Sequence, residues 1–131
     1  MKITLPRHSI LQGVQRCQNV VEKRHTVPIL SNILLQASDH TLHMTATDLE
    51  VGIKTQAQAS VQTPGAATVS ARKLVDIIKE LDADNNVELE TRDAFLHIRS
   101  GRAKFRLSTL PADDYPAISE DESTVAVNLS G

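Results

Sequence analysis

Histidines and closely spaced carboxylates are the side chains of this sequence that could bind a metal or transfer protons. His40 and His43 are separated by two residues, but no second pair of cysteines or histidines completes a zinc site. Asp48 and Glu50 could act as paired carboxylates, yet no acidic residue adjoins them to complete a metal or acid–base site. We therefore interpret these four residues as parts of turns and strand edges, and we predict no catalytic group, metal or cofactor.

The remaining reactive group is a thiol. Cys17 is the single cysteine and lies on the apolar stripe of an expected helix, so we predict a buried, structural thiol. One cysteine cannot form an internal disulfide, which fits a reducing cytoplasm. The glycines are scattered and form no phosphate-binding loop. Apolar runs are short, so we expect no membrane span and no export signal.

Charge is divided unevenly along the chain. All 14 lysines and arginines precede residue 111, whereas the residues after 110 carry five acidic side chains and no basic one. A tight, sequence-reading DNA-binding protein usually has a strong basic excess, which this chain lacks. Two phenylalanines and one tyrosine are also too few for a platform that stacks single-stranded bases.

Two segments have the apolar period of amphipathic helices. The first is expected from about Arg7 to Asn19, and the second begins after the N-cap Ser70 and ends before the turn at residues 82–86. The predicted core stripes are Ile10, Val14 and Cys17 in the first helix and Leu74, Ile78 and Leu81 in the second. The opposite faces carry His8, Gln12 and Gln15, then Arg72, Asp76 and Lys79.

Alternating strand patterns surround these helices and repeat within the chain. A shift of 64 residues superimposes the apolar pattern of the first helix on the second, and a shift of 54 superimposes the strands that follow. The sequence therefore predicts an α+β domain built from two strand–helix–three-strand repeats, with both helices side by side on an antiparallel sheet layer.

The pattern changes after Pro111. Residues 111–122 are acidic, include Asp113 and Asp114, and lack an apolar period, whereas residues 124–129 alternate again as a strand. We predict one domain over residues 1–119, followed at 120–131 by a linker and the first strand of a truncated second domain.

Several motifs, in order, resemble the N-terminal domain of bacterial DNA polymerase III beta subunits, the sliding clamps. They are residues 25–35 (HTVPILSNILL), 45–50 (TATDLE), 69–73 (VSARK), 99–111 (RSGRAKFRLSTLP) and Tyr115-Pro116. The resemblance implies the DNA-clamp fold and a non-catalytic subunit of a DNA-directed DNA polymerase holoenzyme. Two subunits of three such domains would form a ring around duplex DNA, without reading its sequence, and tether the polymerase. The polymerase core and the clamp loader would bind through domains that this chain lacks.

The resemblance also implies DNA-binding residues. It makes Arg24 a contact to the DNA backbone and Lys23 a weaker candidate, and it turns the polar helix faces toward DNA. A mildly positive face suits sliding, because strong phosphate contacts would hold the protein in one place. An ordinary solvated helix face has the same composition, so the residues alone leave both interpretations open. The helix-face candidates are Arg72, Lys79, Gln15, Gln12 and His8.

A second implied site is an edge strand near residues 102–107, with Arg102, Lys104 and Arg106 on one face. Such charges also protect an edge strand from aggregation. In the family this edge pairs with the other subunit, through an apolar patch (Phe105, Leu107 and Ile77) and charges (Lys73, Arg102 and Lys104). Polar substitution of Phe105 and Leu107 is expected to prevent ring closure but leave the domain folded. The alternative function is a small interaction module that captures acidic peptides on this strand.

Overall fold

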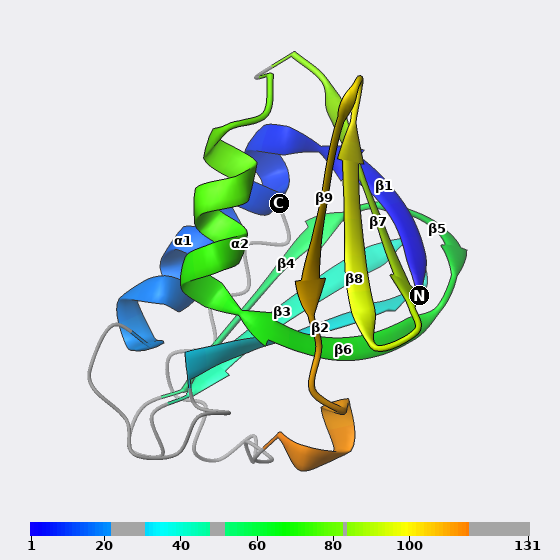
Figure 1. The fold of residues 1–131 in the computed structure, drawn as a ribbon. Helices are drawn as coiled ribbons and strands as arrows, with labels where there is room; N and C mark the ends of the chain where they lie inside the picture. Colours follow the sequence, from blue (N-terminus) through cyan, green and yellow to red (C-terminus); the bar gives the residue numbers. More distant parts are fainter. Residues whose placement is uncertain (22–30, 48–51, 83, 116–131) are drawn as a thin grey trace.

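The chain folds as two successive units, each made of a strand, a helix and three strands (Figure 1). The computed structural model describes residues 1–21, 31–47, 52–82 and 84–115. The first unit comprises β1 (Lys2–Pro6), α1 (Arg7–Val21), β2 (Asn32–Ser38), β3 (Thr41–Thr47) and β4 (Gly52–Gln58). A short strand, β5 (Ser60–Thr63), leads to the second unit: β6 (Gly65–Ser70), α2 (Ala71–Lys79), β7 (Asn86–Arg92), β8 (Phe95–Ser100) and β9 (Ala103–Ser108). The predicted α+β duplication is confirmed.

The strands form two antiparallel sheets rather than one joint layer, because each unit contributes its first strand to the other unit. One sheet has the order β5-β1-β7-β8-β9 and the other β4-β3-β2-β6. Leu5 of β1 lies opposite Val87 of β7, and Ile33 of β2 lies opposite Val69 of β6. These two pairs superimpose under the shifts of 64 and 54 residues, so the exchange repeats in register.

The predicted correspondence fails only in the last strand of each unit. Met44 lies opposite Thr55, whereas its counterpart Ile98 lies opposite Phe105, so Thr55 corresponds to Phe105 and not to Thr109. The last-strand shift is therefore four residues shorter than the 54 expected, because the β3–β4 connection is longer than the β8–β9 turn. Alternation cannot detect this difference, since a displacement by an even number of residues keeps the same side chains on the same face.

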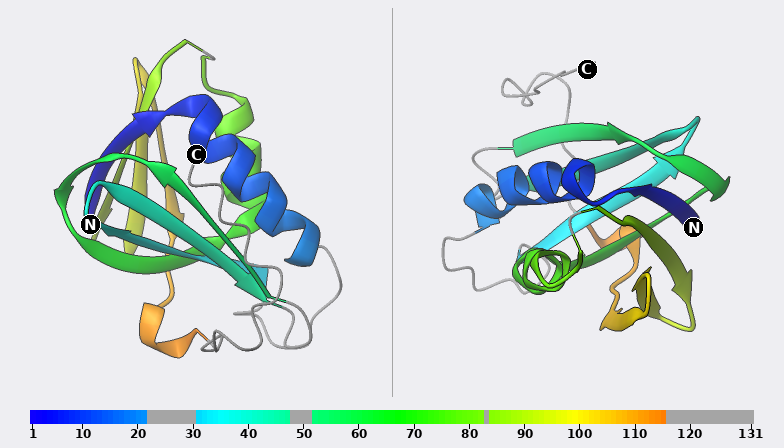
Figure 2. Two further views of the ribbon diagram at one scale, coloured as in Figure 1. Left: turned by 180° about the vertical axis from the view of Figure 1, so that it is seen from behind. Right: turned by 90° about the horizontal axis from the view of Figure 1, so that it is seen from above.

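The two helices lie side by side on one side of the domain, as Figure 2 shows. The predicted core stripes of both helices are buried, and Ser70 caps α2 as predicted, since its side chain accepts a hydrogen bond from the Lys73 amide. At Gly13 helix α1 approaches β3 so closely that an added Cβ would lie 2.2 Å from Met44 Cε. A glycine at this position therefore sets the distance between helix and sheet.

Arg7, at the start of α1, contacts the end of α2. Its Nε donates to the carbonyl of Ile78 at 3.0 Å, and its guanidinium also reaches the carbonyl of Lys79 at 3.4 Å. These carbonyls lie at the end of α2, where the Leu81 amide also donates to the Ile78 carbonyl at 3.1 Å, so the cation adds a further donor and complements the helix dipole. The contact places the start of α1 against the end of α2, which makes the helices antiparallel.

Residues 109–115, here called the strap, continue from β9 to the second sheet, where we predicted only an acidic linker. Leu110 and Thr68 of β6 exchange two backbone hydrogen bonds of 3.0 and 3.1 Å, and a short 3-10 helix follows at Ala112–Asp114. The strap is the counterpart of β5, because Ser60 lies opposite Thr4 of β1 as Leu110 lies opposite Thr68 of β6. Each unit thus ends in a segment that pairs with the first strand of a unit: β5 pairs with β1, and the strap pairs with β6.

The β2–β3 and β7–β8 hairpins share one turn geometry. Asp39 and His40 have φ values of 51° and 61°, and Asp93 and Ala94 have φ values of 53° and 65°. Two successive residues with positive φ define the type I′ turn, whose second position favours glycine. Ala94 occupies this position with a Cβ that the left-handed conformation disfavours.

We predict that Ala94→Gly stabilises the domain by about 1 kcal/mol, because removal of the Cβ relieves the left-handed conformation and outweighs the flexibility gained by the unfolded chain. Urea unfolding of both proteins at pH 7 measures the difference. Ala66→Gly, in the exposed part of β6, is the control and is expected to destabilise by about 0.5–1 kcal/mol. Equal destabilisation by both substitutions would contradict the prediction.

Candidate nucleic-acid face and edge strand

The helix face that the sequence assigns to DNA is exposed. His8, Gln12 and Gln15 project from α1, and Arg72 and Lys79 project from α2, all outside the buried stripes. The two helices that carry these five residues are adjacent and lie on one side of the domain (Figure 2). Asp76 shares this surface, so the face is polar and mildly positive rather than strongly basic.

Two further cations belong to α1 and were not singled out from the sequence. Arg7 and Arg16 are half-buried, and α1 carries no acidic residue between Arg7 and Val21. Arg7 is already occupied by the carbonyls at the end of α2. Arg16 lies outside the predicted polar face of the helical wheel, which explains why periodicity did not identify it. It adds positive charge to the helix pair.

The loop residues Lys23 and Arg24 lie outside the described residues, as do Asp48 and Glu50. Their assignments therefore remain predictions. The same holds for the linker and strand expected at residues 120–131.

Strand β9 ends its sheet, and no described strand pairs with its outer side. Lys104 and Arg106 are exposed along it, whereas Arg102 lies in the two-residue β8–β9 turn and not on the strand face where we placed it. Within the described part of the chain, neither Arg102 nor Lys104 forms an ion pair. Arg106 is engaged differently: its Cζ lies 4.5 Å from the centroid of the Phe95 ring, a cation–π contact.

The opposite side of β9 faces the core. Phe105 is half-buried opposite Ile98, and Leu107 lies opposite Leu96 with only 9% of its surface exposed. The expectation that polar residues at both positions leave the domain folded is therefore wrong for Leu107, which belongs to the domain's own core. Phe105, at the margin of that core, remains suitable for probing an interface.

Helix α2 lies beside β9 and brings two more predicted interface residues to this region. Lys73 is exposed and Ile77 is half-buried, packed against the core. Both belong to the α2 flank that periodicity placed off the core stripe. The structure thus joins the helix and strand parts of the expected interface, although nothing described here occupies the edge.

Opposite charges occupy the outer surface of the β7–β8–β9 sheet. Arg99 forms an ion pair with Glu88, and Arg92 lies 4.0 Å from Glu90. The hydrogen bond to Glu88 is the main cause that raises the pKa of the Arg99 guanidinium. Within each pair the two charges partly neutralise each other. This surface therefore has less unpaired positive charge than the edge strand.

Tyr115 is a structural residue that periodicity did not identify. Only 7% of its surface is exposed, and its hydroxyl accepts a hydrogen bond from the Thr47 amide at 3.0 Å. Burial raises the pKa of this phenol to about 12. One aromatic residue between Asp114 and Pro116 is the signal in the sequence that the acidic segment packs against the domain.

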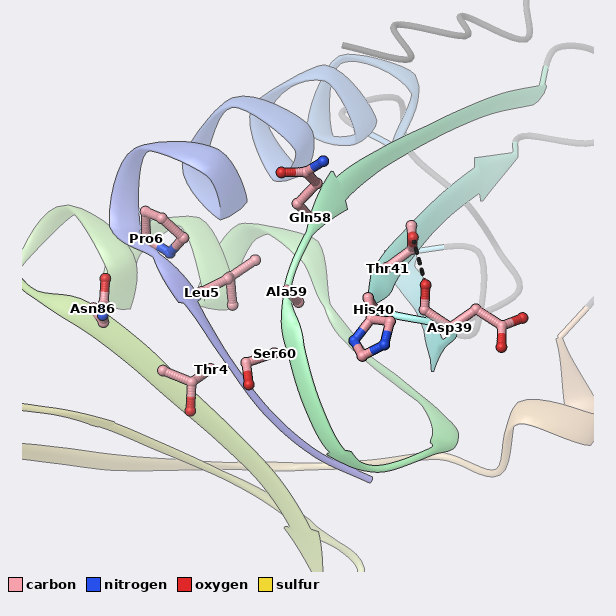
Figure 3. Close-up of a pocket in the computed structure, with 10 residues that line it drawn as sticks. All are labelled: Thr4, Leu5, Pro6, Asp39, His40, Thr41, Gln58, Ala59, Ser60 and Asn86. Atoms are coloured by element: carbon pink, nitrogen blue, oxygen red, sulfur yellow. Dashed lines mark hydrogen bonds between the residues drawn. The ribbon is translucent and has the colours of Figure 1, made fainter.

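An open, mainly polar hollow of about 600 Å³ lies between β1, the β2–β3 turn and the β4–β5 corner (Figure 3). None of the predicted DNA-binding or interface residues lines it. In the described ranges, no group of three or more histidine, cysteine or acidic side chains is placed to hold a metal. No described helix is long and apolar enough to cross a membrane.

These features define a class of protein: a duplicated α+β domain whose two antiparallel helices present a polar, mildly positive face, and whose sheet ends in a basic edge strand.

Comparisons with known proteins identify the family. The family model for the N-terminal domain of the DNA polymerase III beta subunit matches residues 1–119, and the chain belongs to this family. It is 40% identical over 130 residues to the beta sliding clamp of Pseudomonas putida, covering 98% of this chain and 35% of that protein. The Escherichia coli K12 beta sliding clamp is 39% identical over 130 residues, with 98% and 36% covered.

Solved structures agree. A Caulobacter crescentus beta sliding clamp superimposes with a TM-score of 0.89 and 41% identity, covering 92% of this chain and 32% of that chain. A Pseudomonas aeruginosa DNA polymerase III beta subunit gives a TM-score of 0.84 and 39% identity, with 92% and 32% covered. The chain therefore spans about a third of the length of these relatives. The DNA-clamp fold predicted from the motifs is confirmed.

Burial of Cys17 has a consequence for stability above neutral pH. Desolvation raises the pKa of this thiol to about 12, while in the unfolded chain the thiol titrates near its ordinary value of 9.0. Between these values the unfolded chain binds fewer protons than the folded one, so stability falls as the pH rises.

We predict that the free energy of unfolding falls by about 1 kcal/mol between pH 8 and pH 10 because of Cys17 alone. Urea unfolding of wild type and Cys17→Ala at pH 7, 8, 9 and 10 measures it. The substitution is expected to remove this part of the slope, whatever its effect at pH 7. Parallel pH profiles for the two proteins would contradict the assignment.

Proposed function

We propose that this chain is the first of three clamp domains in a DNA polymerase III beta subunit, and that two such subunits form a ring around duplex DNA. The single observation that carries the proposal is the match of residues 1–119 to the family. The exposed faces of the two helices are compatible with it. In this role the subunit catalyses no reaction. It keeps the replicative polymerase on its template by encircling the DNA.

The helix face supports sequence-independent attraction to DNA. Its exposed side chains are amides, a histidine, one carboxylate and a few cations. Cations attract phosphates at any sequence, and each neutralised phosphate releases counterions. We propose that Arg72, Lys79, Gln15, Gln12 and His8 face the DNA, and that Arg24 and Lys23 contact its backbone.

Retention on DNA of different topology tests the ring. The full-length subunit, loaded onto nicked circular DNA, is expected to remain bound at a salt concentration that removes electrostatic binders. Linearisation of that DNA should release it, because a ring slides off the ends. A protein that binds circular and linear DNA equally well would refute the encircling function.

We predict that the double substitution Arg72→Ala and Lys79→Ala lowers the dependence of DNA binding on salt. The slope of log K against log salt should fall by about 0.9 for each phosphate that is no longer neutralised, and therefore by up to about 2. Titrations of the full-length subunit on duplex DNA at several salt concentrations measure the slope. Arg92→Ala on the opposite sheet surface is the matched control, and an equal effect of both would exclude the helix face.

We further propose that β9 forms the subunit interface, with Phe105 and Ile77 as its apolar part, Leu107 beneath them in the domain core, and Lys73, Arg102 and Lys104 as its charges. An unpaired strand edge offers backbone hydrogen bonds to a partner strand, and adjacent cations favour an acidic one. The same observation supports the second candidate function, capture of an acidic peptide by a free-standing module.

The prediction for this interface uses Phe105 rather than Leu107, because only Phe105 lies at the margin of the core. In the full-length subunit, Phe105→Ser should increase the dimer dissociation constant by at least about tenfold, since it removes an apolar anchor. Sedimentation equilibrium measures the constant, and thermal unfolding checks that the domain remains folded. A dimer of unchanged affinity, or an acidic peptide bound by a monomeric wild type, would favour the interaction module.

A further inference from the structure

The strap holds the end of β9 through a buried network as well as through its backbone pair. Thr68 is fully buried, and its hydroxyl donates to the Leu110 carbonyl at 3.1 Å. The same hydroxyl accepts a hydrogen bond from the Asn32 side-chain amide at 3.0 Å. One hydroxyl therefore connects the strap to β2 and β6, two neighbouring strands of the second sheet.

Tyr115 extends this network to a third strand. The β2–β3 ladder ends at Leu34 and Thr45, and two residues further its register would place Asn32 opposite Thr47. The Tyr115 hydroxyl stands at that position instead: it accepts from the Thr47 amide at 3.0 Å and donates to the Asn32 carbonyl at 3.4 Å. The phenol thus bridges the backbone of β2 and β3 and attaches the far end of the strap to both strands.

This attachment matters for β9 because, among the described strands of its sheet, only β8 is paired with it. Its outer side has no described partner strand. The β8–β9 turn fixes its first end, and the strap, which begins directly after Ser108, fixes its other end. An edge that must pair with another subunit binds more tightly when its conformation is set in advance, since less conformational freedom is given up on binding.

We propose that Thr68 and Tyr115 are positioning residues for the subunit interface: their hydroxyls hold the strap on the second sheet and thereby fix the edge strand that pairs with the partner. The proposal rests on the proposed function of β9. Neither residue is a member of the interface, because both are buried inside the domain.

Substitutions at Thr68 separate the hydroxyl from the shape of the side chain. Thr68→Val keeps the shape and removes the hydroxyl, whereas Thr68→Ser keeps the hydroxyl. In the full-length subunit we expect Thr68→Val to increase the dimer dissociation constant about tenfold and Thr68→Ser to restore most of the affinity. Tyr115→Phe, which removes only the phenolic hydroxyl, should act in the same direction as Thr68→Val.

Thr91→Val is the matched control for a merely structural role. Thr91 also uses its hydroxyl in a long-range hydrogen bond, accepted from the Met1 amino group at 2.9 Å, but it lies on β7, which β8 separates from β9, and within the described residues it forms no hydrogen bond with the strap. Melting temperatures of both variants give the loss of stability. If Thr68→Val weakens the dimer no more than Thr91→Val at equal loss of stability, or leaves it unchanged, the positioning role is refuted.

Hydrogen exchange in the 131-residue chain tests the positioning role even where no dimer forms. The Thr109 amide donates to Ala94 O at 3.0 Å, and the equivalent Ala59 amide donates to His40 O at 3.0 Å in the other unit. Thr68→Val should accelerate exchange at Thr109 about tenfold and leave Ala59 unchanged. Unchanged exchange at Thr109 would overturn the inference, whereas a monomeric wild-type subunit would refute the proposed function alone.

Discussion

The structure depends on the exchange of β1 and β6 between its two units. Each unit makes a three-stranded sheet whose inner edge is unpaired until the first strand of the other unit adds to it. Backbone groups at such an edge need partners when they are buried, so neither unit can complete its sheet alone. The exchange also places each helix directly after the exchanged strand, which brings α1 and α2 together on one side.

The same duplication creates an asymmetry with functional consequences. Ser60 pairs with Thr4 within the regular strand β5, whereas the equivalent Leu110 pairs with Thr68 at one isolated bridge. In the first unit the pairing with β1 is thus made by the strand β5, and β6 follows it in the chain. In the second unit the strap pairs with β6, and the buried hydroxyls of Thr68 and Tyr115 contribute to its attachment. The end of β9 is consequently held by a few backbone hydrogen bonds and by side chains, whereas the end of β4 is followed by a paired strand.

The sequence predicted those features that impose a regular spacing on apolar residues. Both helix stripes, the Ser70 cap and the duplication follow from apolar spacing, because burial of one face imposes that spacing on any sequence. Leu107 was misjudged because alternation separates two faces without saying whether the domain or a partner covers one. Tyr115 was missed because a single aromatic residue has no period, and its partners Asn32 and Thr47 are distant in the sequence. The family motifs supplied the remaining assignments.

A mildly positive helix face fits a ring better than it fits a free DNA-binding protein. A monomer that must stay on DNA depends on affinity, and more phosphate contacts increase both affinity and salt dependence. A closed ring stays on DNA by topology, so its inner face needs only weak positive charge. In the proposed ring, Asp76 beside Arg72 and Lys79 is therefore compatible with function, because it limits the time spent at any one phosphate. How long the ring stays on DNA then depends on how strongly its subunit interface holds. In the proposed ring the position of β9 therefore matters more than added charge on α1 or α2.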